Sequence, residues 1–287
     1  MKKRLLLTVV LATLALFFVI VTGFLLIRQD VAFRIFEHCA SLFRRSDCQA
    51  IEIETESVEV STLHGLISAQ MLISSDYPIP ENFAPALIEI DDHKVSSEIS
   101  SSFLLLRQAI YEKYQDTVMI RSSYRTREEQ EEIYGTLTPD IAAKVGASEH
   151  QIGLSLDVYI EGTTGGAILT TKAGRYLHRH CHEYGFILRY PYGKSDITGI
   201  SYEPWHIRYV GLPHATIIYE EDLTLEEYVF EFLKENVYFQ EGKYLISRQI
   251  PSDGKIQLPK QYTSLEVSPD NCGGYIITAT IDESPLE

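Results

Sequence analysis

The stretch SEHQIGLSLDV, residues 148–158, limits the possible folds more than any other part of this chain. In one extended strand, His150 and Asp157 would lie about 23 Å apart, at ~3.3 Å per residue. They would also point to opposite faces, because the side chains of a strand repeat every two residues. Glycine adopts turn conformations that other residues avoid, so a turn at Gly153 can bring the two side chains back together. The stretch therefore predicts a loop, a turn and a strand that aim His150 and Asp157 at one point.

A second stretch, GISYEPWHIRYVG at residues 199–211, contains another carboxylate and another imidazole. Glu203 precedes Pro204, and the residue before a proline is restricted to an extended conformation. The residues that follow alternate between polar and apolar, so His206 and Arg208 share one face of a predicted strand. The pattern predicts that this strand presents His206, with Glu203 just before it.

Together, His150, Asp157 and His206 offer two nitrogens and one oxygen, which suits one zinc ion with a fourth position left for water. Glu203 lies next to the last of these ligands and is placed to act as a base without binding the metal, while zinc lowers the pKa of its bound water. The alternative is that these are polar core residues satisfied by hydrogen bonds, with Glu203 orienting a ligand. We favour the metal site because all four occur together.

The stretch SSYRTREEQ, residues 122–130, predicts a strand that ends where a helix begins. Thr126 and Glu129 have the spacing of a capping box, which marks the first turn of a helix. Arg125 lies at this junction, where its guanidinium can face the same cleft as the metal. A fixed donor with two parallel N–H groups suits a substrate carboxylate or a developing oxyanion. The alternative for Arg125 is a structural ion pair.

The N-terminus carries an uncharged run, residues 5–27, between the basic residues 2–4 and Arg28. This run is long enough to cross a bilayer, which takes ~20 residues. It is longer than the apolar core of a signal peptide, and no small-residue cleavage site follows it. We expect a single-pass membrane anchor with its N-terminus inside and the catalytic domain on the extracytoplasmic side. A buried core helix is the alternative.

Two other groups of possible ligands are weaker. Cys39 and Cys48 could close a small disulfide loop, but four cysteines allow three pairings and the sequence does not choose among them. His178 and His182 in the stretch HRHCH are one helical turn apart, yet no carboxylate accompanies them with clear geometry. The net charge of −15 argues against nucleic acid as a partner, because such a surface repels phosphates.

Helical and strand patterns alternate without a regular βαβ rhythm, so we expect an α+β fold. Its centre would be a small, mostly antiparallel sheet flanked by helices. The expected helices are residues 97–114, 126–134, 171–184 and 224–236. The expected strands are residues 51–63, 118–126, 154–160, 205–210, 242–250 and 273–281.

The expected division of the chain follows from these patterns. It comprises a membrane anchor (1–28), a stalk and N-terminal extension (29–96), a zinc-binding domain (97–235) and a small C-terminal β appendage (236–287).

Three stretches of the chain, taken together, resemble a known enzyme family. The pattern SxHxxGxxxD at residues 148–157, the segment at 185–211 and TLEEY at 224–228 resemble the VanY-type D-alanyl-D-alanine carboxypeptidases. The related L,D-carboxypeptidases of cell-wall recycling share these features. The resemblance covers about residues 97–230. One departure is Ser155, which stands where the family usually has alanine.

The resemblance implies that His150, Asp157 and His206 bind one zinc ion and that Glu203 is the general base. It also implies a set of side chains that contact the peptide substrate. These are Arg125, Gln130, Ser148, Tyr190 and Trp205.

The function implied is a zinc-dependent carboxypeptidase that removes the terminal D-alanine from peptidoglycan stem peptides or their precursors, with D-Ala-D-Ala ends as the first expectation. One alternative is an L,D-carboxypeptidase that acts on tetrapeptide stems. Another is a cell-wall binding protein without activity, although such a protein has no need of Glu203. The role of residues 236–287 stays open.

Overall fold

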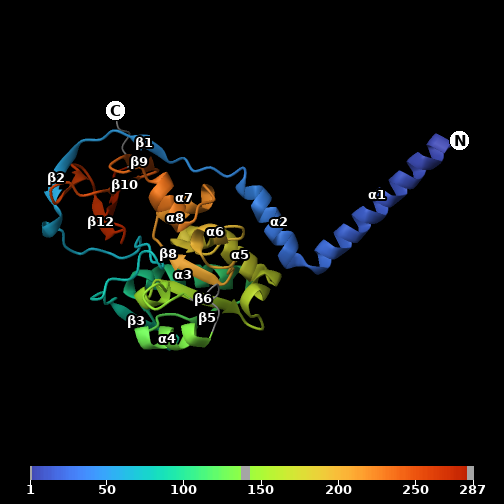
Figure 1. Cartoon of the computed structure of the whole chain (residues 1–287), viewed down its shortest axis with the longest axis horizontal. Coiled ribbons are helices and arrows are strands. Elements are labelled where there is room, and N and C mark those ends of the chain that lie inside the picture. Colours follow the sequence, from blue (N-terminus) through green and yellow to red (C-terminus); the bar gives the residue numbers. More distant parts are fainter. Residues whose placement is uncertain (1, 137–142, 283–287) are drawn as a thin grey trace.

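The computed structural model describes residues 2–136 and 143–282. Figure 1 shows helix α1 (Lys2–Ile27) projecting away from the rest of the chain. Helix α2 (Gln29–Ser41), in contrast, lies against the body of the molecule. In the described part of the chain, no single helix meets the length and hydropathy expected of a membrane span. The segments Thr13–Phe24 and Gln29–Ser41 meet that test only as a pair bent by 104°.

The central sheet contains β5 (Val118–Ser122), β6 (Ser155–Ile160), β8 (His206–Tyr209) and β7 (Phe186–Leu188), in that spatial order. Each neighbouring pair is antiparallel. Asp157 of β6 is in register with Ser122 on one side and with His206 on the other. This register places the three predicted stretches side by side, so the expected antiparallel sheet is confirmed.

Helices cover this sheet and supply its core. The expected helix at 97–114 is confirmed as a 3₁₀ turn, η2 (Ser97–Ile99), followed by α3 (Ser100–Tyr114). The helix expected at 171–184 is α5 (Lys172–His180) followed by η5 (Cys181–Tyr184), and it ends at Gly185 with a left-handed φ of 81°. Buried side chains of α3, α5 and β6 share one core, among them Phe103, Leu106, Ile110, Leu156, Val158 and Leu177.

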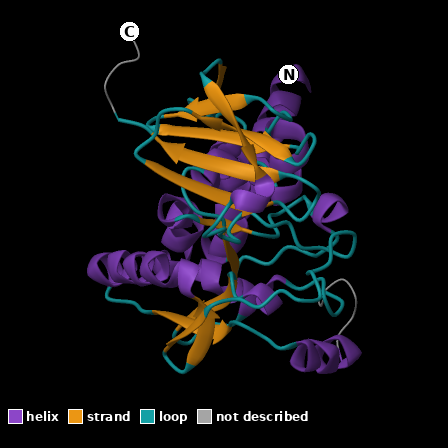
Figure 2. Ribbon diagram, turned by 90° about the vertical axis from the view of Figure 1, so that its left-hand side faces the viewer, coloured by secondary structure: helices purple, strands orange, loops and turns teal. Residues whose placement is uncertain are grey.

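A second sheet lies at one end of the molecule (Figure 2). Its order is β1 (Gln49–Ile51), β9 (Tyr238–Glu241), β10 (Tyr244–Gln249), β13 (Tyr275–Thr280) and β12 (Ser264–Pro269). Beside it, β2 (Thr55–Glu59) pairs with β11 (Lys255–Pro259). The expected strands at 242–250 and 273–281 are therefore present, and residues from before the central domain complete this C-terminal β unit.

Other expectations differ from the structure. The stalk expected after residue 28 is instead α2, followed by an irregular segment to residue 48. The strand expected at 51–63 is divided, and a 3₁₀ turn, η1 (Val60–Thr62), ends it. The last helix is shorter than expected, since α8 (Leu225–Glu227) continues only as a π-helical turn, η6 (Tyr228–Phe232). All four cysteines are described and none forms a disulfide.

The remaining elements lie outside the sheets described above. They are β3 (Leu87–Ile90), β4 (His93–Ser96), α4 (Arg127–Thr136), η3 (Glu149–Ile152), η4 (Gly165–Thr170), α6 (Ser195–Thr198) and α7 (His214–Glu220).

Candidate metal centre

Three predicted ligands meet beside the two inner strands of the central sheet, β6 and β8, which carry Asp157 and His206. One ligand atom from each of His150, Asp157 and His206 lies within 4.8 Å of the others, and no second group of this kind occurs among the described residues. His206 Nδ1 is 3.0 Å from Asp157 Oδ1, and His150 Nε2 is 3.4 Å from Asp157 Oδ2. Two imidazole nitrogens around one carboxylate form a donor set that fits zinc.

The local backbone explains how His150 reaches this point. His150 belongs to the 3₁₀ turn η3, which ends at Gly153 with a φ of 71°. A Cβ on Gly153 would come within 2.9 Å of the Ser96 backbone nitrogen, so both the conformation and the space require glycine. The turn predicted at this glycine is thus confirmed.

The tautomer of His150 also suits a metal ligand. Its Nδ1 lies 2.8 Å from the carbonyl oxygen of Ser123, so Nδ1 carries the proton and donates it to that oxygen. Nε2 then keeps its lone pair on the side of Asp157. Such a backbone partner for the second nitrogen is usual for metal-binding histidines, because it fixes both the ring and the tautomer.

Glu203 lies beside these ligands, three residues before His206 in the chain. One of its carboxylate oxygens, Oε2, is 3.6 Å from His206 Nδ1, and the residue is only 8% exposed. Its backbone N–H donates to the Tyr190 carbonyl oxygen at 3.1 Å. Burial raises the pKa of Glu203 to about 7. A carboxyl group of this kind can exchange a proton near neutral pH.

Arg125 is held firmly at the strand-to-helix junction. Its Nη2 donates to Asp157 Oδ2 at 3.2 Å and to Ser122 Oγ at 2.9 Å, and its Nε donates to the same Ser122 Oγ at 3.0 Å. Its Nη1 donates to Gln130 Oε1 at 3.0 Å. The capping box of Thr126 and Glu129 is present, with both reciprocal hydrogen bonds formed. Burial lowers the pKa of the Arg125 guanidinium, which nonetheless keeps its charge.

A cleft of about 310 Å³ opens over the three ligands. Arg125, Ser148 and Glu203 line it, as do the aromatic side chains of Tyr190 and Trp205. Gln130 is placed differently: it is fully buried behind Arg125 and donates to the Ala143 carbonyl oxygen at 2.7 Å. The structure therefore brings most predicted site residues to one cleft, with Gln130 supporting Arg125 from behind.

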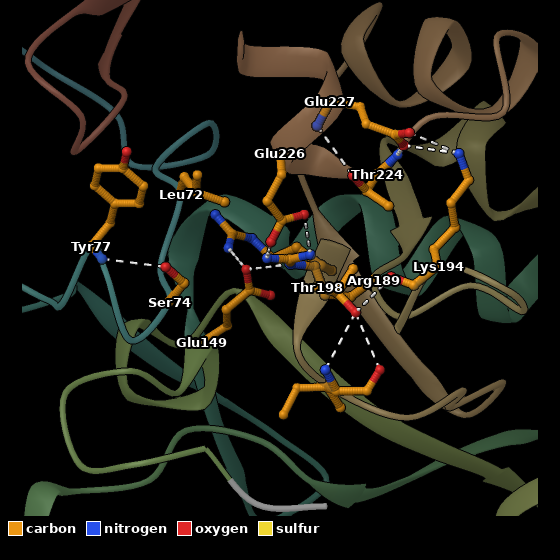
Figure 3. Close-up of polar contacts among 12 residues, drawn as sticks. Leu72, Ser74, Tyr77, Glu149, Arg189, Lys194, Thr198, Thr224, Glu226 and Glu227 are labelled. Atoms are coloured by element: carbon orange, nitrogen blue, oxygen red, sulfur yellow. Dashed lines mark hydrogen bonds and ion pairs between the residues drawn. The ribbon is translucent and has the colours of Figure 1, made fainter. Parts of the chain in front are cut away.

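Sequence reasoning missed a buried ion network beneath this cleft. Figure 3 shows Arg189 between two carboxylates: its Nε donates to Glu149 at 2.7 Å, and its Nη2 donates to Glu226 at 2.6 Å. Arg208 Nη1 lies 2.7 Å from the same Glu149 carboxylate. Burial raises the pKa of Glu149, but the charges of Arg189 and Arg208 outweigh it and lower the pKa to about 2.

This network joins segments that are distant in sequence. Glu149 immediately precedes the ligand His150, and Glu226 belongs to the TLEEY stretch, for which the sequence suggested no role. The unusual Ser155 takes part, since its hydroxyl donates to Glu149 Oε2 at 3.1 Å. Only the position of Glu149 next to a ligand could have signalled the network from the sequence.

Comparisons with known proteins identify the family of this chain. A family model described as VanY, D-alanyl-D-alanine carboxypeptidase, matches residues 92–212. A D-alanyl-D-alanine carboxypeptidase of Enterococcus faecium is 34% identical over 231 residues, which span 72% of this chain and 74% of that protein.

Two solved structures are similar. A vancomycin-resistance D,D-dipeptidase, VanXYg, bound to a D-Ala-D-Ala phosphinate analogue, superposes with a TM-score of 0.66 at 26% identity, over 80% of this chain and all of that one (100%). A D,D-pentapeptidase VanY variant in complex with Zn(II) gives a TM-score of 0.50 at 33% identity, over 56% of this chain and 98% of that one. The chain belongs to the VanY family of D-alanyl-D-alanine carboxypeptidases.

Proposed function

We propose that this protein is a zinc-dependent carboxypeptidase that removes the terminal D-alanine from peptidoglycan stem peptides ending in D-Ala-D-Ala. One observation carries the proposal: two histidines, an aspartate, a buried glutamate and a fixed arginine converge on one cleft in a chain of this family. The relatives with similar sequences act on D-Ala-D-Ala by their names, which supports the same substrate class here.

The proposed roles follow from the geometry. His150, Asp157 and His206 hold the zinc ion, which when bound polarises the scissile carbonyl and acidifies a water molecule. Glu203, which lines the cleft 3.6 Å from His206 Nδ1, takes the proton of the attacking water and passes it to the leaving amine. A carboxylate that does not bind the metal is free for this transfer.

Arg125 is proposed to stabilise negative charge on the substrate. Its four hydrogen bonds to Ser122, Gln130 and Asp157 use four of its five N–H groups. The remaining N–H, on Nη1, has no hydrogen-bond partner among the described residues and can donate to a substrate oxygen. A guanidinium fixed in this way needs no reorganisation when charge develops.

Localisation is a separate proposal. Residues 1–28 are proposed to anchor the enzyme in the cell membrane, with the catalytic part on the extracytoplasmic side. The uncharged run and its basic N-terminal flank support this proposal. Fractionation of cells that express the full chain, followed by protease treatment of intact spheroplasts, tests it: protection of the catalytic part would contradict it.

Activity is tested with two synthetic stems. The full chain is incubated with a pentapeptide that ends in D-Ala-D-Ala and with a tetrapeptide that ends in one D-Ala, with and without chelator, and free D-alanine is quantified. We expect release from the pentapeptide and loss of release with chelator. Release from the tetrapeptide alone would assign the L,D activity. Binding of either stem by the zinc-loaded protein without any release would instead identify a binding protein.

A further inference from the structure

The segment between β7 and β8, residues 189–205, lines a different cavity on each of its two sides. On one side Tyr190, Glu203 and Trp205 line the cleft over the metal ligands. On the other side Tyr192 and Tyr202 line a cavity of about 100 Å³ whose opposite wall is α2. We call this segment the β7–β8 loop. Since Glu203 follows Tyr202 directly, whatever holds Tyr202 from outside also limits the movement of Glu203.

The side chain of Arg34, from α2, contacts both tyrosines. Its guanidinium carbon lies 5.5 Å from the centre of the Tyr192 ring and 5.9 Å from that of Tyr202. The two rings meet edge to face, with centroids 5.6 Å apart. A guanidinium within about 6 Å of aromatic rings is attracted to their faces. Arg34 is itself oriented by Asp30, which pairs with it at 3.6 Å.

The two ends of the loop are tied together where Arg34 reaches them. The Glu203 backbone N–H donates to the carbonyl oxygen of Tyr190 at 3.1 Å. The hydrogen bond therefore joins the start and the end of the loop near the cleft. Arg34 contacts the same two ends from the outer face, through Tyr192 and Tyr202. The outer contact and the inner hydrogen bond together fix the position of the Glu203 backbone.

The helix α2 is anchored well enough to serve as a support. Phe33 is 5% exposed and packs edge to face on His178 of α5, with centroids 5.1 Å apart. Glu37 is 8% exposed and forms ion pairs with Arg179 of α5 and with Arg44. Arg44 in turn lies 3.9 Å from the centre of the Tyr219 ring in α7. Figure 1 shows α2 beside the part of the molecule that carries α5 and α6.

We propose that Arg34 is a positioning residue for the reaction: it holds Tyr192 and Tyr202 from outside and so keeps Glu203 in place over the metal ligands. The catalytic part of this inference rests on the proposed function. It makes α2 a component of the active enzyme, although the helix lies on the side of the loop away from the cleft.

The test compares full-length variants in detergent. Arg34→Ala removes the contact, Arg34→Lys keeps a cation, and Arg28→Ala is the matched control, because Arg28 also pairs with Asp30 but is exposed. We expect Arg34→Ala to lower kcat by about tenfold with a smaller change in KM, because small misplacement of a catalytic group is costly. Arg34→Lys should recover much of the loss, and Arg28→Ala should equal the parent. Bound zinc should be equal in all.

A second readout needs no activity. Trp205 is the single tryptophan of the sequence and lies in the same loop. We expect acrylamide to quench its fluorescence more strongly in Arg34→Ala than in the parent, with partial recovery in Arg34→Lys. Tyr192→Ala provides an independent variant should Arg34→Ala not fold, since Tyr192 is exposed and its loss removes one ring of the contact. It should increase quenching in the same direction.

The outcomes are distinct. Parental kcat and parental quenching in Arg34→Ala, or equal effects of Arg34→Ala and Arg28→Ala, would overturn the proposal. If the parent itself releases no D-alanine, the proposed function fails. The quenching series then still decides whether Arg34 restrains the loop.

Discussion

Replacement of Glu149 by glutamine is expected to destabilise the protein strongly, although Glu149 does not line the cleft. The residue is 1% exposed, and its carboxylate faces two buried guanidinium groups, those of Arg189 and Arg208. A neutral amide would leave both cations without their shared counter-charge. Removing one partner from a buried ion pair costs about 3–5 kcal/mol.

The pKa of Glu149 gives a second measure of the same interaction. Its pKa falls from 4.5 to about 2 in the folded protein. At 1.36 kcal/mol per pKa unit, that difference corresponds to about 3 kcal/mol of stability in favour of the ionised form. Because the folded pKa is the lower one, this contribution is complete above pH 4.5 and is lost as the pH falls toward 2. Both routes agree on about 3 kcal/mol.

The assay is urea unfolding of the parent and Glu149→Gln at several pH values, with chelator present so that metal binding adds nothing. Glu226→Gln is the control: it also loses a carboxylate next to Arg189 but leaves the Glu149 pair intact, so we expect about 1 kcal/mol. The free-energy difference for Glu149→Gln should shrink below pH 4.5. A difference under about 0.5 kcal/mol at pH 7, or one independent of pH, would refute the reasoning.

Three further predictions concern the site and its support. Glu203→Gln should lower kcat at least ~10²-fold while zinc content stays unchanged, and retained activity would rule out Glu203 as the base. Gly153→Ala should cost more than about 1 kcal/mol and weaken zinc binding measured by competition with a chelator, because φ is 71° and Ser96 blocks a Cβ. Gly166→Ala, at a site with open space, serves as its control, and equal effects would contradict the steric argument. Removal of residues 1–27 should leave kcat at the parental value, whereas removal of residues 1–46 should lower it to the value of Arg34→Ala; equal kcat in both would show that α2 is dispensable.

The clustering of His150, Asp157 and His206 was predictable because its signals are local. A glycine between two ligand types, a proline after Glu203 and polar–apolar alternation around His206 each specify backbone geometry over a few residues. The strand register then brings Asp157 beside His206. In an antiparallel sheet with one buried face, the alternation of polar and apolar residues specifies this register.

The ion network beneath the cleft gave no such signal. Its charged residues come from η3, β8, α8 and the loop after β7. Charged residues are mostly exposed, so each of them taken alone predicts a surface position. The buried Arg189 is paired with the carboxylates of Glu149 and Glu226, which come from segments distant in sequence, so the pairing is a property of the assembled fold. The C-terminal sheet was equally hard to predict from local patterns. Its strand β1 pairs with β9, and the whole central domain lies between the two in sequence.

The docking of α2 shows why a hydrophobic pattern can miss a packed helix. Its buried residues, Phe33, Glu37 and Ser41, follow at intervals of four, so they form one stripe along the helix. Only Phe33 is apolar, and a search for apolar periodicity therefore sees no buried face. Glu37 is tolerated there because Arg179 reaches it from α5. A helix that packs through ion pairs and cation–aromatic contacts resembles a solvated stalk in composition. Its burial depends on the charges of its partner, so it can be recognised only in the folded structure.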